Sequence, residues 1–145
     1  MKIQVLHIED CPNWQEAGDR VRLVLDSIGR GDVPVEFVLI RTEAEAVSSG
    51  FAGSPTILLD GQDLFPSQGN TADLACRVYL TERGFAGAPT VGQLERTLQE
   101  RGKARELEAL LRDLPGPGQT SFTRQQGPLG LGHAVWCARD IVGDE

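Results

Sequence analysis

Strand-like and helix-like segments alternate along most of the chain, and this alternation limits the folds that it can adopt. Residues 14–28 repeat apolar side chains at helical spacing, and residues 42–50 suit a shorter helix that ends at Gly50. A third helix follows the capping box Thr90–Gln93. Short apolar runs with the composition of strands lie around these helices: residues 2–8, 33–40, 53–61 and 75–81. The order predicts an α/β fold with a βαβ unit followed by a ββα unit.

The first strand has the pattern of a central strand. Only Gln4 and His7 are polar within residues 3–8, as expected for a strand that is covered on both faces. A right-handed crossover should make the first two strands parallel. The third strand is entered through Ser54–Pro55 and left through the turn Asp60–Gly61, so it should form an antiparallel hairpin with the fourth.

Size and composition favour one domain with an appendage. The chain has 145 residues, enough for one hydrophobic core, and we expect a domain over residues 1–114. Residues 115–145 are rich in glycine and proline, so we expect a flexible, poorly ordered tail. The formal net charge is -7 without a basic block, which argues against nucleic acid and anionic membrane as partners. Since no membrane-spanning run or signal peptide is evident, we expect a cytoplasmic protein.

The chain has three widely spaced cysteines, Cys11, Cys76 and Cys137, which does not suggest a disulfide framework. Cys11 lies where the first strand gives way to the first helix. Unpaired N–H groups and the helix dipole at such a position favour a thiolate, while the preceding acids Glu9 and Asp10 oppose it. The alternative is that Cys11 is a small buried apolar residue, as free cysteines often are. We favour the functional interpretation.

The motifs "DCPNW" and "GSPTILLDG", in this order of elements, resemble the thioredoxin-like superfamily, and glutaredoxins especially, over residues 1 to about 100. The resemblance implies a three-layer βαβ–ββα sandwich. It makes Cys11 the nucleophile, Pro12 the proline after it and Pro55 a cis-proline that faces the thiol. Together with "CRVY" and "GAPTVGQLERTL", these motifs are similar to a group of small actinobacterial thioredoxin-like proteins that are often named alkylmercury lyases.

One departure from the superfamily pattern affects the chemistry. Trp14 stands where the redox motif has its second cysteine. Cys11 would therefore use a monothiol route, with a low-molecular-weight thiol or a partner protein thiol as co-substrate and no bound cofactor. The implied ligand-binding residues are Pro12, Trp14, Ser54 and Pro55, and the backbone of Ser54 should be open to pair with an extended thiol ligand.

His7 and Cys76 are two further candidate partners of Cys11. If the chain is extended, His7 lies about 13 Å away, so we favour a satisfied core histidine over a catalytic base. Cys76 should begin the fourth strand, antiparallel to residues 56–60. That register also separates Cys76 from Cys11 by about 13 Å, which is too far for a disulfide.

The tail contains a short second resemblance. The quartet from Cys137 to Asp140 within "HAVWCARD" resembles the catalytic segment of organomercurial lyases. By that resemblance, Cys11, Cys76 or Cys137 would hold mercury as thiolates and Asp140 would protonate the departing carbon, which suits the affinity of thiolates for soft metals. We favour the simpler interpretation of the tail as an extension without this chemistry.

The sequence thus leaves three functional classes. The first is a thiol protein that uses Cys11 for monothiol exchange or for binding a soft metal or thiol ligand. The second cleaves or handles organomercury compounds. The third is a binding module that catalyses nothing, because a fold alone does not determine activity.

Overall fold

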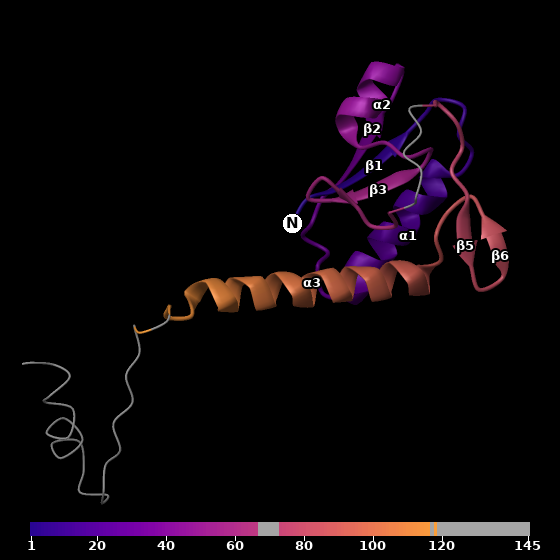
Figure 1. Cartoon of the computed structure of the whole chain (residues 1–145). Helices are drawn as coiled ribbons and strands as arrows, with labels where there is room; N and C mark the ends of the chain where they lie inside the picture. Colours follow the sequence, from indigo (N-terminus) through magenta and orange to yellow (C-terminus); the bar gives the residue numbers. More distant parts are fainter. Residues whose placement is uncertain (67–72, 117, 119–145) are drawn as a thin grey trace, which may run out of the picture. The chain divides into compact units, whose positions relative to one another are not determined.

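The structure is a computed structural model that describes residues 1–66, 73–116 and 118. It contains a mixed four-stranded sheet with helices on both faces (Figure 1). The strand order in this sheet is β2-β1-β3-β4, and β5 and β6 form a separate hairpin. The elements in chain order are β1 (Ile3–His7), α1 (Trp14–Ser27), β2 (Val35–Leu39), α2 (Glu43–Ser49), β3 (Thr56–Leu59), β4 (Gln62–Asp63), β5 (Tyr79–Thr81), β6 (Gly84–Ala86) and α3 (Val91–Asp113). The α/β class predicted from the sequence is confirmed.

The chain divides into two compact units, Met1–Ala104 and Arg105–Glu145. All the strands named above, α1, α2 and the first turns of α3 belong to the first unit. The described residues of the second unit are 105–116 and 118, and they carry the last turns of α3. Within the described residues, no helix is both long enough and apolar enough to span a membrane.

The central strand β1 pairs on both sides, as its apolar pattern predicted. It runs parallel to β2 from Ile3↔Val35 to His7↔Leu39, and antiparallel to β3 from Ile3↔Leu59 to Leu6↔Thr56. The tight turn after β3 is also as expected. Asp60 and Gly61 both have positive φ, 49° and 82°, which is the geometry of a two-residue hairpin loop of the Asp-Gly type.

Alternating side chains of the strands form a hydrophobic core on each face of the sheet. On one face, β1 and β3 pack against α1 and the start of α3 through a cluster that includes Val5, Val21, Ile57, Leu94 and Leu98. On the other face, they pack against α2 through Leu6, Ile40, Ala46, Phe51 and Leu58. Because both faces are covered, β3 is buried along its whole length, and so are the residues just before it.

The predicted helix signals are present. The Thr90 side chain accepts from the Gln93 N–H at 3.2 Å, and the Gln93 side chain accepts from the Thr90 N–H at 3.0 Å, which completes the capping box of α3. Helix α2 ends at Gly50, whose φ of 77° is the left-handed cap typical of glycine.

The predicted fourth strand over residues 75–81 is wrong in extent and in partner. Residues 75–77 form only an isolated parallel bridge, Ser54↔Cys76, and the strand β5 begins at Tyr79. β5 pairs with β6, a segment for which no strand was predicted. On the side of β3 away from β1, the partner is instead the two-residue strand β4.

Candidate functional site

Cys11 lies in a turn between β1 and α1. Its N–H donates to the Ile8 carbonyl at 3.4 Å, so the chain doubles back before the helix. The helix begins at Trp14 with Asn13 as its N-cap, which places Pro12 before the first helical turn. Cys11 is 4% exposed, yet neither hydrophobic cluster of the described residues includes it. The Cys11 side chain is therefore largely shielded from solvent.

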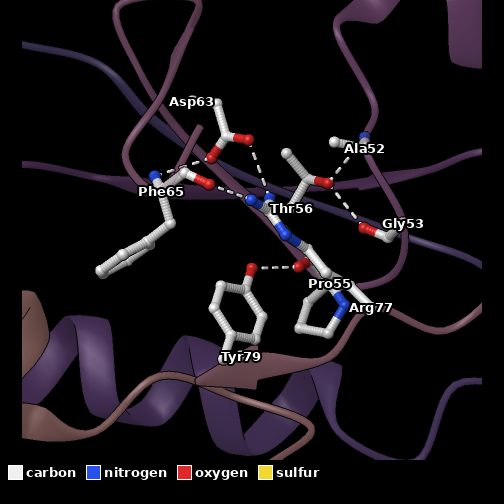
Figure 2. Close-up of polar contacts among 8 residues, drawn as sticks. All are labelled: Ala52, Gly53, Pro55, Thr56, Asp63, Phe65, Arg77 and Tyr79. Atoms are coloured by element: carbon white, nitrogen blue, oxygen red, sulfur yellow. Dashed lines mark hydrogen bonds and ion pairs between the residues drawn. The ribbon is translucent and has the colours of Figure 1, made fainter. Parts of the chain in front are cut away.

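Ser54 connects this turn to the start of β3. Its hydroxyl accepts a hydrogen bond from the Ile8 N–H at 3.1 Å, which continues the contact of β1 with β3 beyond Leu6↔Thr56. The peptide bond between Ser54 and Pro55 is cis, as the sequence resemblance implied. Thr56 holds the loop before it, because its hydroxyl accepts from the Ala52 N–H and donates to the Gly53 carbonyl (Figure 2).

Tyr79 links β5 to the start of β3. Its hydroxyl donates to the Pro55 carbonyl (Figure 2). Burial raises the pKa of Tyr79 above its usual range, Arg77 opposes the rise, and the negative charges of Asp63 and Cys11 add to it. The charge of Cys11 is thus close enough to act on the Tyr79 hydroxyl, which itself contacts Pro55.

A buried arginine holds the segment that carries Tyr79. Arg77 is 7% exposed and forms an ion pair with Asp63 at 2.8 Å. It also donates to the Phe65 carbonyl, and its guanidinium lies 4.8 Å from the centre of the Tyr79 ring (Figure 2). Sequence reasoning missed Asp63, Arg77 and Tyr79. The available signal was an arginine inside the apolar run "CRVY", since a charge that is buried must be paired.

The backbone of Ser54 is already paired within the chain. Its N–H donates to the Ala75 carbonyl, and its carbonyl accepts from the Arg77 N–H, both at 2.8 Å. The expectation that this peptide edge stands open for an extended ligand is therefore wrong. The cause is the close approach of residues 75–77, which Gly53 permits: a Cβ at Gly53 would lie 2.9 Å from the Arg77 Cβ.

Trp14 and His7 form an aromatic stack beside the turn. Their ring centres are 4.2 Å apart and nearly parallel, and Phe37 meets Trp14 edge-on at 5.3 Å. His7 is buried, and its Nδ1 lies 3.1 Å from the Ile8 carbonyl oxygen. The chain turns between Ile8 and Cys11, so the extended conformation on which the expected separation of His7 from Cys11 depended is wrong.

Cys76 differs from Cys11 in its exposure. Cys76 is exposed and lines an open pocket of about 550 Å³, together with Phe65, Tyr79 and Phe85. Cys137 and Asp140, the residues expected to serve a mercury lyase, lie outside the described residues. In the part of the chain that is described, no group of three or more His, Cys, Asp or Glu side chains is arranged to hold a metal ion.

Comparison with known proteins gives short matches. No protein-family model matches the chain, and no solved structure matches it. The chain is 47% identical over 53 residues to the UTP–glucose-1-phosphate uridylyltransferase of Bacillus subtilis (strain 168), and 45% identical over 53 residues to that of Escherichia coli (strain K12). The first match covers 37% of this chain and 18% of the relative, and the second 36% and 18%. The chain thus spans less than a fifth of these relatives, which does not assign it to their family.

Proposed function

We propose that this chain is a thioredoxin-like thiol protein in which Cys11 alone carries out thiol–disulfide exchange with a small co-substrate. The sheet order β2-β1-β3-β4, with one parallel and two antiparallel pairings and helices on both faces, supports this fold. The position of Cys11, directly after β1 and before α1, supports its role as the nucleophile. The tryptophan at position 14 leaves no nearby cysteine in the helix to resolve a disulfide.

The observation that carries the proposal is that the turn containing Cys11 is joined to the start of β3. The Cys11 N–H donates to the Ile8 carbonyl, and the Ile8 N–H donates to the Ser54 hydroxyl at 3.1 Å. The charge of Cys11 also contributes to the raised pKa of Tyr79, whose hydroxyl donates to the Pro55 carbonyl. A thiol placed just before a helix N-terminus is in the type of environment that favours a reactive thiolate.

The proposed exchange has two steps. The Cys11 thiolate attacks one sulfur of a small disulfide, the S–S bond breaks, and the departing thiolate takes a proton from water. A second small thiol, as its thiolate, then attacks the small molecule's sulfur in this mixed disulfide, which forms a new small disulfide and releases the Cys11 thiolate. Summed over two such cycles, one disulfide is reduced to two thiols while two thiols are oxidised to one disulfide.

Mass spectrometry can test this assignment on the full chain. We expect 2-hydroxyethyl disulfide to form a mixed disulfide at Cys11, and we expect Cys11→Ser to slow catalysed exchange at least about tenfold, because the nucleophile is lost. Cys76→Ser is the matched control and should leave the rate unchanged. Exchange that survives Cys11→Ser, or a mixed disulfide found at the other cysteines but not at Cys11, would refute the proposal and leave a binding module.

A further inference from the structure

The peptide edge at Ser54 is filled by a segment of the same chain. An extended polypeptide that binds a protein edge does so through backbone N–H and C=O groups. At Ser54 both groups are bonded to residues 75–77 at 2.8 Å, in a parallel bridge opposite Cys76. A second extended chain therefore cannot use the same groups until residues 75–77 leave.

Residues 75–77 are firmly held. Arg77 is 7% exposed and is fixed by the Asp63 carboxylate and the Phe65 carbonyl, so lifting the segment would expose an ion pair and break several hydrogen bonds. Gly53 lets the two backbones approach, because a side chain there would also meet the Arg77 Cα at 3.2 Å. The contact of residues 75–77 with Ser54 is thus fixed by the anchors of Arg77 and by the close approach at Gly53.

The chain that follows the segment lies beside the turn that carries Cys11. Tyr79 lies two residues beyond Arg77 and donates to the Pro55 carbonyl, and Ser54, before that proline, accepts from the Ile8 N–H at 3.1 Å. The Cys11 N–H in turn donates to the Ile8 carbonyl. Further along, Gly87 approaches the N-cap of α1 so closely that a Cβ there would collide with the side-chain amide nitrogen of Asn13. Residues 75–87 thus contact the chain on both sides of the Cys11 turn, and Cys11 itself is 4% exposed.

We propose that residues 75–77, by bonding the backbone N–H and C=O of Ser54, restrict Cys11 to small thiols and disulfides and exclude extended polypeptides. This inference rests on the proposed function and names its substrate class. Specificity here comes from blocking the larger substrate, since the hydrogen-bonding groups that a peptide needs are already bonded. Arg77 is the positioning residue of this block, because it anchors the segment through its side chain and its backbone N–H.

The test compares two disulfides with the same leaving group on the full chain. One is 2-hydroxyethyl disulfide, and the other is a short linear peptide whose cysteine is bonded to 2-mercaptoethanol. Peptide mapping follows the reaction of Cys11 with each disulfide. We expect Cys11 to react at least about tenfold faster with the small disulfide. In Arg77→Ala the ratio of the two rates should fall to about twofold or less, because the backbone N–H and C=O of Ser54 become free to bind the peptide.

Two controls separate loss of the segment from loss of stability. Leu94→Ala removes a fully buried side chain from the core and destabilises the chain, but it leaves residues 75–77 in place, so the selectivity should persist. Asp63→Asn weakens the anchor more gently and should shift the ratio in the same direction as Arg77→Ala, even if the latter does not fold.

The outcomes are distinct. Equal rates for the two disulfides in the wild-type chain would overturn the inference and leave the proposed function standing. Selectivity that both Arg77→Ala and Asp63→Asn retain, or that Leu94→Ala loses equally, would also overturn it. A Cys11 that reacts with neither disulfide would refute the proposed function itself.

Discussion

Arg77→Ala should lower the free energy of unfolding by about 3 kcal/mol, the low end of the range for breaking a buried ion pair. The side chains of Arg77 and Asp63 are 6% and 15% exposed, so removing the arginine leaves a carboxylate with little access to water. The Phe65 carbonyl loses a donor, and the Tyr79 ring loses the cation above it. Each of these losses affects a neighbouring group, and each lowers the free energy of unfolding.

Urea denaturation of the wild-type and variant chains measures this change. The matched control is Arg96→Ala, because Arg96 pairs with Glu82 at 3.8 Å but the two side chains are 66% and 83% exposed. An exposed pair of this kind contributes less than about 1 kcal/mol, so this control should unfold at nearly the wild-type urea concentration. If the two variants were equally stable, the buried role assigned to Arg77 would be wrong.

Gly53→Ala should cost about 3 kcal/mol of stability, for two physical reasons. Gly53 has a φ of 104°, a conformation that side chains rarely adopt. In addition, the new Cβ would lie 2.9 Å from the Arg77 Cβ and 3.3 Å from the Arg77 N, and the backbone cannot yield without breaking the bridge to Ser54.

Gly84→Ala is a close control for this variant. Gly84 has nearly the same φ, 105°, but no atom lies within 4 Å of the position that its Cβ would take. It should therefore cost only the conformational strain, about 1–2 kcal/mol. The difference between the two variants, measured by urea denaturation, isolates the close approach of residues 75–77. Equal losses would mean that Gly53 is needed for its φ alone.

Much of the fold could be predicted from local sequence signals. The parallel β1–β2 pair, the Asp60–Gly61 turn and the capping box of α3 each depend on residues close in the chain or on a short, regular crossover. Apolar periodicity also identified the buried side of α1, where Ala17, Val21 and Val24 lie in the core. These features agree because local preference and packing favour the same structure.

The surroundings of Cys11 were less predictable because they depend on long-range contacts. The run "ACRVYLT" has the composition of a strand, but the partners of its residues lie elsewhere in the chain: Ser54 for the bridge and Asp63 for the side chain of Arg77. Nothing in the local pattern distinguishes that arrangement from a hairpin with β3. The distance expected between His7 and Cys11 assumed an extended chain, whereas the segment turns between Ile8 and Cys11.

The central claim, that Cys11 lies close enough to the Tyr79 hydroxyl for its charge to act there, is tested most directly by titrating Tyr79. The chain contains one tyrosine, so its ultraviolet absorbance change with pH reports this hydroxyl alone. Because burial raises its pKa in the folded chain, the stability from keeping Tyr79 neutral is fully present below about pH 10. This stability is lost as the pH rises further, through the raised pKa of Tyr79 in the folded chain.

In the wild-type chain we expect Tyr79 to ionise at a pH well above the pKa of free tyrosine. In Cys11→Ser it should ionise at a lower pH than in the wild type, because the thiolate charge that raises its pKa has been removed. Cys76→Ser should leave the wild-type titration unchanged. An ionisation midpoint near pH 10 in the folded wild-type chain, or a midpoint that does not move in Cys11→Ser, would contradict the account.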